Sequence, residues 1–389
     1  MRAPGTPTAT RWRCRRVLLV PLLGLLLAGL LASPASPAGA AGASTSLPSY
    51  LADATDPAVT TLARDRHISL QEAQRRIGWQ EPAMQLGEEL RRALGDRFGG
   101  LWFDEAGGGR VKVGLVGADR SAAAALIARR QLTAVTDLVA VQHSYADLGQ
   151  AHAWLSEAIM KPNPPAAKGQ ISGLASALLI DKNQVQLQLP RGQTLNAAQQ
   201  AVVAAAKRRL GPSLAVGSWS GQIHTEACEW GLGPAIWDCD PPLRGGVGIV
   251  SFSGTTRATC TAGFNESQLS HWRPGPYVYV HLSPDTTENS LYPIKAVGSS
   301  TKGLRVCVSG AVSGTDCAPV KQTGWPVAGG YAVVDYCTTG GDSGGPVFSG
   351  NYARGIHIGA KTGAAACHDR LYQGVAEATR QLHVSVVHT

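Results

Sequence analysis

The stretch TTGGDSGGPVFSG, residues 338–350, places a serine in a setting that is typical of enzymes that attack carbonyl groups. Gly341 and Gly344 lie close to Ser343 on either side, and Asp342 directly precedes it. A serine hydroxyl is a weak nucleophile unless a neighbouring base takes its proton. The alternative for Ser343 is an ordinary serine in a glycine-rich turn. The rest of the sequence must therefore supply a fold around this loop and a base beside it.

The residues around this loop, from His224 onward, are rich in β-strand patterns. They form short runs that Gly, Pro, Ser and Asp interrupt, with few helical patterns before the segment 374–387. This texture is typical of an antiparallel barrel or sandwich. We therefore expect an all-β region that begins near residues 215–225.

The region before it, from about residue 44 to 215, contains no cysteine and alternates helical with strand patterns. Ser69 and Glu72 stand at capping-box spacing, and residues 81–98 continue with apolar side chains at helical intervals. Two strands are expected within 100–116. A second unit follows the Pro-rich linker KPNPPAAKG at 161–169. It combines a hairpin over 175–190, which turns at Asp181–Asn183, with a helix over 194–210. The region is predicted to be α+β.

The N-terminus has the pattern of an export signal. Residues 11–16, RWRCRR, are basic, residues 17–31 are apolar, and residues 36–43, SPAGAAGA, are small. The alternative is a retained membrane anchor, but an apolar run of fifteen residues is short for a membrane span. We expect a signal peptide over 1–43, a secreted protein and no membrane association after cleavage.

The charge distribution does not favour a nucleic-acid partner. The formal net charge is +8, but five arginines in the first sixteen residues supply much of it. No basic block interleaved with aromatic residues remains, so a nucleic-acid partner is not expected.

Seven of the eight cysteines follow residue 227, and export makes disulfides the natural interpretation of them. Because none forms a CxxC pair or precedes an HxxxH pattern, no metal site is expected.

Several stretches together carry a family resemblance. They are GDSGGP at 341–346, CDPPLRGGV at 239–247, CTAGFN at 260–265, VCVSGAVSGTDC at 306–317 and LYQGVAEA at 371–378. The chain resembles the chymotrypsin-like serine proteases, and within them the streptogrisin and alpha-lytic branch of secreted actinobacterial proteases. Residues 99–115, GGLWFDEAGGGRVKVGL, resemble the pro-region of those enzymes.

The resemblance implies an organisation. It implies a pro-region over 44–220 that assists folding and then inhibits, and a protease domain over 221–389 with two β-barrels and the active site between them. It also implies a serine-type endopeptidase, a hydrolase that acts on proteins or peptides. It needs no cofactor, its partners are its substrates and its own pro-region, and the protein would be a monomer.

The resemblance also implies roles for individual residues. Ser343 would be the nucleophile, and the backbone N–H groups of Gly341 and Ser343 would form the oxyanion hole. Asp342 would fix the loop by pairing with a buried positive group. Disulfides would join Cys337 to Cys367 and Cys307 to Cys317, and a third local bridge would join Cys228 to Cys239.

The family's base and acid are missing from the sequence. In the family, a TAGHC motif that supplies the base follows a CTAGFN-like stretch after an intervening strand, and a later strand supplies the orienting acid. Here only forty-six residues separate Cys260 from Cys307, too few for both motifs and their strands. Cys260 also loses the cysteine that would pair with it. An internal deletion of several dozen residues would explain both observations and would leave the first barrel incomplete.

Two other interpretations of the missing base are open. The TAGF sequence could align with TAGHC, in which case Phe264 replaces the histidine, and a phenylalanine cannot accept a proton. His271 and His281 lie downstream, with Asp285 near the second. Base and nucleophile must be in hydrogen-bond contact, which a residue displaced along the sequence rarely achieves. We therefore expect impaired or absent catalysis.

The segment 353–363, ARGIHIGAKTG, resembles one wall of the primary specificity pocket, so His357, Ile358 and Gly359 are expected to bind substrate. His357 stands where family members that prefer glutamate carry a histidine, which suggests an acidic P1 side chain. The alternative is a wall histidine without a selective role. Three functional hypotheses follow: a secreted serine endopeptidase, an inactive relative that binds peptides or whose pro-region inhibits related proteases, and the product of a damaged gene.

Overall fold

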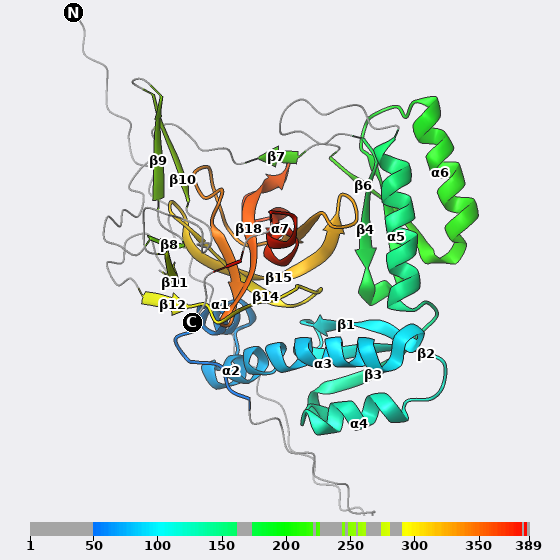
Figure 1. The fold of residues 1–389 in the computed structure, drawn as a ribbon, viewed down its shortest axis with the longest axis horizontal. Helices are drawn as coiled ribbons and strands as arrows, with labels where there is room; N and C mark the ends of the chain where they lie inside the picture. The colour runs from blue at the N-terminus through cyan, green and yellow to red at the C-terminus, as the bar shows by residue number, and fades with distance from the viewer. Residues whose placement is uncertain are drawn as a thin grey trace, which may run out of the picture. The chain divides into compact units, whose positions relative to one another are not determined.

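The computed structural model describes residues 50–161, 173–220, 223–225, 243–245, 248–253, 256–261, 274–280, 290–382 and 385–386. The chain divides at residue 44, and all of these residues belong to the unit Thr45–Thr389. Within that unit an α+β half leads into an all-β half (Figure 1).

The α+β half begins with a helical layer on a small sheet. Its elements are α1 (Pro57–Arg66), α2 (Leu70–Gly78), α3 (Gln80–Leu94), β1 (Phe98–Asp104), β2 (Arg110–Val116), α4 (Ser121–Arg129) and β3 (Thr136–Val141). Ser69 caps α2 by accepting a hydrogen bond from the Glu72 N–H, as the sequence predicts. The sheet order is β1-β2-β3, with an antiparallel and then a parallel pairing.

A second small sheet follows. Its elements are α5 (Tyr145–Met160), β4 (Ala175–Leu179), β5 (Gln184–Pro190), α6 (Ala197–Leu210) and β6 (Leu214–Trp219). The expected hairpin forms between β4 and β5, and Asn183 takes the left-handed conformation at its turn with φ of 53°. The helices α5 and α6 lie together beside this sheet (Figure 1).

Short strands then lead into the all-β half. They are β7 (Ile223–Thr225), β8 (Leu243–Gly245), β9 (Gly248–Ser253), β10 (Thr256–Thr261), β11 (Pro274–Val280), β12 (Ser290–Pro293) and β13 (Ala296–Val297). β9 and β10 pair antiparallel, and β11 pairs with β12 and β8.

The C-terminal part is a closed antiparallel barrel. Its strands are β14 (Arg305–Gly310), β15 (Gly314–Trp325), β16 (Tyr331–Val334), β17 (Pro346–Ser349), β18 (Tyr352–Lys361) and β19 (Arg370–Gly374), and α7 (Val375–Leu382) follows. The order β14-β17-β18-β19-β16-β15 closes through a β14–β15 pairing. Closure pairs the six strands around the ring, while β15 and β18 also extend far enough to pair with β4 and β7. The expected fold class, an α+β region before an all-β barrel region, is confirmed.

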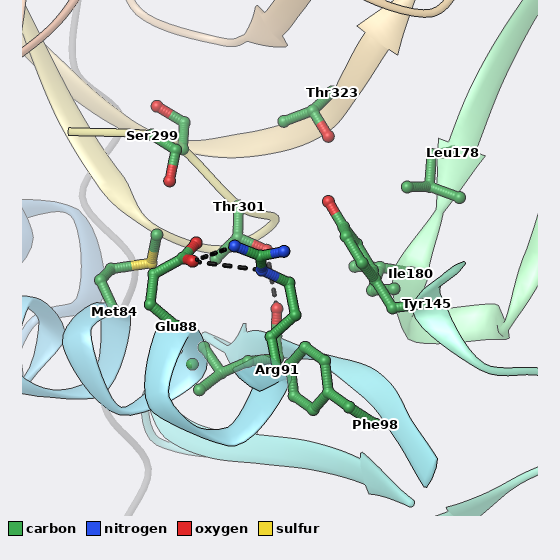
Figure 2. Close-up of a pocket in the computed structure, with 13 residues that line it drawn as sticks. Met84, Glu88, Arg91, Phe98, Tyr145, Leu178, Ile180, Ser299, Thr301 and Thr323 are labelled. Carbon is green, nitrogen blue, oxygen red and sulfur yellow. Dashed lines mark hydrogen bonds and ion pairs between the residues drawn. The ribbon is translucent and has the colours of Figure 1, made fainter. Parts of the chain in front are cut away.

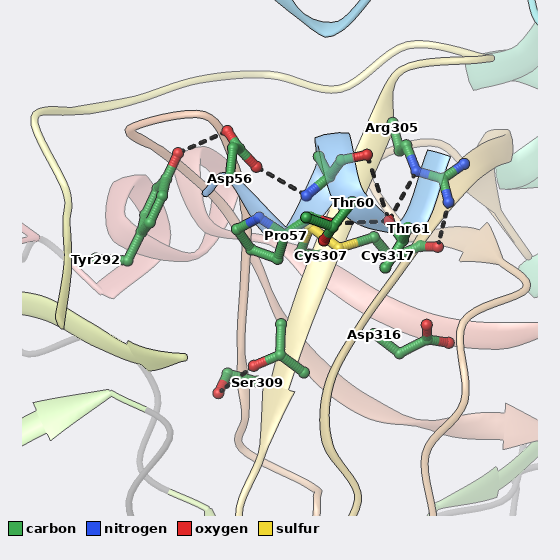
Figure 3. The surroundings of a disulfide bond; sticks show 12 residues. Asp56, Pro57, Thr60, Thr61, Tyr292, Arg305, Cys307, Ser309, Asp316 and Cys317 are labelled. Atoms are coloured by element: carbon green, nitrogen blue, oxygen red, sulfur yellow. Dashed lines mark hydrogen bonds between the residues drawn. A yellow bond between two sulfur atoms is a disulfide. The ribbon is translucent and has the colours of Figure 1, made fainter. Parts of the chain in front are cut away.

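Polar contacts join the two halves through the barrel's arginines. Arg305 is buried, and its guanidinium donates to Thr61 Oγ1 at 3.2 Å and to the Cys317 carbonyl at 3.0 Å (Figure 3). It also donates to the Asp65 carboxylate. Arg354, also buried, pairs with Glu81 of α3. The α1 and α3 helices therefore provide the partners for buried barrel charges.

Backbone pairing joins the halves as well. β4 pairs antiparallel with β15 through Leu178 and Thr323, so one continuous sheet runs from the α+β half into the barrel. Such pairing needs the two strands at the same depth and register, which couples the positions of the two halves.

Candidate active site

The loop that carries Ser343 connects β16 to β17 and is held against β18. The Gly344 N–H donates to the His357 carbonyl at 2.9 Å, and the His357 N–H donates to the Gly345 carbonyl at 2.8 Å. Gly341 and Gly344 have φ values of 96° and 93°, a region that side-chain-bearing residues rarely adopt. The glycines of the motif are therefore required by the backbone path around the serine.

Ser343 is partly buried within this loop. Its Oγ lies 3.4 Å from the Ile358 carbonyl oxygen, toward which it donates. The hydroxyl thus faces β18, the strand that the sequence assigns to the specificity pocket.

Asp342 holds the loop through hydrogen bonds from backbone N–H groups. Its carboxylate is fully buried, and one oxygen accepts from the Val312 and Ser313 N–H groups at 2.9 and 3.0 Å. The other oxygen accepts from the Thr339 N–H at 2.8 Å. Backbone N–H groups thus hold the carboxylate among the described residues, and bonds from such donors to an ionised acceptor are strong; a buried positive partner stays a prediction.

The neighbourhood of Asp342 is tightly packed. A Cβ added to Gly310 would stand 2.3 Å from Asp342 Oδ1. A Cβ added to Gly345 would stand 2.9 Å from the carbonyl oxygens of Asp342 and Ser309. Contacts this short are excluded sterically, so the loop depends on small residues outside the serine motif as well as within it.

Two disulfides brace the barrel around this loop. Cys337, just before the loop, is bonded to Cys367, and Cys307 of β14 is bonded to Cys317 of β15 (Figure 3). These are two of the three pairs that the resemblance implies. Cys228 and Cys239 lie outside the described residues, and Cys260 lies on β10, where the backbone alone is described.

His357 lies on β18 with its side chain fully buried. Its Nδ1 is 3.2 Å from the Tyr336 hydroxyl, and the two rings meet edge to face at 5.6 Å. Ile358 packs against the cluster that contains Trp219 and Trp325, and Gly359 has φ of 149°.

A strand from the junction of the two halves occupies the edge of β18. β7 pairs with it antiparallel, with Thr225 opposite Gly359, His224 opposite Ala360 and Ile223 opposite Lys361. The described backbone of β7 thus runs past the strand that faces Ser343.

The candidate bases cannot be placed beside the serine. His271 and His281 both lie outside the described residues, as do Phe264 and Asp285. Within the part that the structure describes, no group of three His, Cys, Asp or Glu side chains is arranged to hold a metal ion. No helix in that part is long and apolar enough to cross a membrane.

Sequence reasoning missed three residues near this site. Tyr336 contacts the His357 ring, and Gly310 makes room for Asp342. Lys361 of β18 lies opposite Ile223 of β7. Burial lowers the pKa of Lys361 to about 8, and its Nζ lies 4.7 Å from the centre of the Trp325 ring. Tyr336 directly precedes Cys337, the residue before the quoted loop, and this position was the one local signal for it.

A cavity of about 300 Å³ lies elsewhere, where α3, the β4 strand and the segment 299–301 meet (Figure 2). Tyr145, Phe98 and Ile180 line it on one side, and an ion pair between Arg91 and Glu88 lies at its mouth. Ser343 and His357 are not among its lining residues. It is therefore separate from the serine loop.

Comparison with known proteins agrees with the resemblance for the pro-region. Residues 71–129 match the family model described as alpha-lytic protease pro N-terminal. Because this match spans a minor part of the chain, it identifies the pro-region rather than the whole protein. No curated protein matches the sequence.

Solved structures with some similarity are bacterial proteases. They include a chymotrypsin of Cellulomonas bogoriensis (18% identity, 36% of this chain and 76% of that one, TM-score 0.26) and Thermobifida fusca protease A (18% identity, 38% and 80%, TM-score 0.26). A third is described as a glutamic acid specific serine protease that utilizes a novel histidine triad in substrate binding (22% identity, 36% and 73%, TM-score 0.26). Superpositions at these scores are too poor to support an argument about this chain.

Proposed function

We propose that the chain is a secreted serine endopeptidase of the streptogrisin type by lineage, with Ser343 as its nucleophile and with strongly impaired turnover. The observation that carries the proposal is the Ser343 loop, which lies against β18. Asp342 fixes this loop by accepting hydrogen bonds from three backbone N–H groups. The proposed organisation is a signal peptide over 1–43, a pro-region over 44–220 and a protease domain over 221–389. The protein would act outside the cell as a monomer.

The proposed chemistry is acyl transfer. Ser343 Oγ would attack the carbonyl carbon of a peptide bond and expel the amine, and water would then hydrolyse the acyl-enzyme. The N–H groups of Gly341 and Ser343 would stabilise the oxyanion. The sequence lacks the motif that would take the serine proton. Loss of triad members leaves a residual acceleration of about 10³ to 10⁴ over water, so turnover would be very slow.

The pairing of β7 with β18 supports peptide binding at this edge. The pairing runs antiparallel beside the serine loop and involves three consecutive residues on each strand. An extended substrate in the same place would gain the same main-chain hydrogen bonds. We place the processing bond near the boundary at residues 220 and 221, within a window of about 212–235. N-terminal sequencing of the mature protein tests this placement.

An acidic P1 preference is part of the proposal. His357 supports it, because its carbonyl holds the loop of Ser343 and its ring is buried beside Tyr336 in the wall next to that serine. An imidazole can donate a hydrogen bond to a carboxylate. Binding of product-like peptides ending in Glu, Gln or Phe tests the preference, and equal affinities would refute it.

A serine-directed phosphonate tests the central claim. Wild type and Ser343→Ala would be exposed to the probe, alongside a complete relative. We expect specific labelling at Ser343 that is slower than in the relative by about 10³-fold or more. Labelling at the relative's rate would show that a base is present and would refute the impairment. No Ser343-dependent labelling at all would refute the nucleophile assignment.

The second candidate is a catalytically inactive protein that binds peptides, or whose pro-region inhibits related proteases. The strand pairing between β7 and β18 also favours this function, because it requires no proton transfer. Titration of the full chain against a complete relative distinguishes it. Inhibition without Ser343 labelling supports the second candidate, and labelling without inhibition supports the first.

A further inference from the structure

A buried polar cluster lies where the α+β half meets the barrel. His152 of α5 is 4% exposed, and its Nε2 lies 3.1 Å from Ser176 Oγ on β4. The Ser156 hydroxyl lies 3.2 Å from the same Oγ and donates to the His152 carbonyl at 2.7 Å. We name these three residues the His152 cluster.

The barrel segment Gly324–Ala328 closes over this cluster. The Ser176 N–H and its hydroxyl both donate to the Pro326 carbonyl, at 2.6 and 3.1 Å. The Ala328 N–H donates to Ser156 Oγ at 2.8 Å. At Gly324, whose φ is 66°, a Cβ would stand 2.8 Å from His152 Cε1. The imidazole is therefore packed directly against the barrel's backbone.

We propose that the His152 cluster is an acid-sensitive latch, which holds the α+β half against the barrel segment Gly324–Ala328 at neutral pH and releases it when His152 is protonated. The reason is steric and electrostatic. The ring is buried among hydroxyls and backbone, and no carboxylate among the described residues contributes to its pKa, so a charge formed there would be poorly solvated. The latch does not depend on catalysis at Ser343.

The surroundings of the imidazole ring determine the direction in which its pKa shifts. Desolvation lowers the pKa of His152 to about 4, and a hydrogen bond with the Gly324 backbone acts weakly in the opposite direction. The groups that face the ring are the Ser156 and Ser176 hydroxyls and the backbone of the barrel segment. Among the described residues, no charged side chain of α5, β4 or that segment contributes to the shift.

The pH dependence of the latch follows from the difference in proton binding between its closed and open states. The ordinary pKa of a histidine is 6.5, and burial in the closed latch lowers the pKa of His152 to about 4, so an opened state with the ring in water would bind more protons between those values. The stability of the latch is fully present above pH 6.5 and is lost as the pH falls toward 4. With these values the opening equilibrium rises about 20-fold between pH 7 and pH 5.

Two carboxyls at the same interface respond in the opposite sense. Burial raises the pKa of Asp56, which accepts from the Tyr292 hydroxyl, and that of Glu81, which pairs with Arg354. Their contribution to stability is present at low pH and is lost as the pH rises through their pKa in the folded state. The contribution of His152 is therefore the difference between wild type and a His152 variant.

Hydrogen exchange on the full chain tests the latch. The observed quantities are the protection factors of the Ser176 and Ala328 amides at pH 7 and pH 5, which already correct for the intrinsic exchange rate. In wild type we expect protection to fall about 20-fold between the two pH values. In His152→Gln we expect a fall of less than about threefold. The control His67→Asn changes an exposed histidine and should behave as wild type.

Two outcomes overturn the proposal. One is equal pH dependence in wild type and His152→Gln, and the other is greater protection at pH 5 than at pH 7 in wild type. If His152→Gln does not fold, Ser176→Ala provides the test, because it removes the hydroxyl and keeps the imidazole buried. That variant should open more at both pH values and retain the wild-type pH dependence. Loss of the pH dependence in Ser176→Ala would refute the role of the imidazole.

Discussion

Replacing Asp342 by Asn is the perturbation that examines the serine loop most directly. The substitution preserves the shape of the side chain and removes its charge. One carboxylate oxygen accepts from Val312 and Ser313, and the other accepts from Thr339. An amide has a single accepting oxygen, so its NH₂ group must face at least one of these donors.

The size of the effect follows from these bonds. If the amide oxygen keeps the Val312 and Ser313 donors, the Thr339 N–H is left buried and unpaired, which costs about 1–3 kcal/mol. The two retained bonds change from charged to neutral acceptors, which removes about 1 kcal/mol from each. Since such terms are not additive, we expect a loss of about 3 kcal/mol in the free energy of unfolding of the barrel.

Urea unfolding with pulsed hydrogen exchange measures this loss, because peptides from β14 and β17 report on the barrel separately from the α+β half. The matched control is Asp335→Asn, since Asp335 also accepts from a backbone N–H and a lysine but its side chain is 32% exposed. We expect the control to lose about 1 kcal/mol or less. If Asp342→Asn matches its control, the carboxylate does not fix the loop and the account of the site is wrong.

Three further predictions concern the barrel and its attachment. Gly310→Ala should lose about 2–3 kcal/mol in the same assay, because its Cβ would stand 2.3 Å from Asp342 Oδ1; an unchanged midpoint would show that the contact relaxes freely. Replacing Cys337 and Cys367 by serine opens a loop of 30 residues and should lower the free energy of unfolding by about 3.6 kcal/mol. Replacing Cys307 and Cys317 opens a loop of 10 residues and should lower it by about 2.7 kcal/mol. The reverse order would contradict the loop-entropy reasoning. Asp65→Asn should lower the free energy of unfolding in urea by about 2 kcal/mol, because its partner Arg305 is 1% exposed whereas Asp65 itself is partly exposed. The control Glu88→Gln, in an exposed pair with Arg91, should lower it by less than about 0.5 kcal/mol. Equal losses would refute the argument from burial.

Local chemistry explains what the sequence predicted correctly about the fold. The cap at Ser69, the hairpin that turns at Asn183 and the helix that ends at Leu210 each depend on residues within a few positions of one another. The all-β character of the C-terminal half follows in the same way from short runs and frequent turn residues. These features need no knowledge of distant contacts.

The omissions concern distant partners. The backbone donors to Asp342 were missed, because the sequence does not reveal where backbone N–H groups point, and those at Val312 and Ser313 lie about thirty residues away. Pairing between Leu178 and Thr323 joins strands 145 residues apart, and no local pattern specifies such a register. His152 is a single histidine on a helix, and its environment exists only after the barrel closes over it.

The assignment of the base depends on segments that the structure does not describe. The shortage of residues between Cys260 and Cys307 is a property of the sequence itself and stays a prediction of lost catalysis. The histidines at 271 and 281 are therefore tested by the phosphonate experiment rather than by geometry.

The continuous sheet from β6 through β4 into β15 has a consequence for biosynthesis. The ribosome makes the chain from its N-terminus, so residues 175–219 emerge before β15 is translated. The outer edge of β4 then offers open N–H and C=O groups to the nascent strand that carries Thr323. The first half of the polypeptide can thus act as a template on which the longest barrel strand is laid down, and a chain truncated before residue 175 would lack that template.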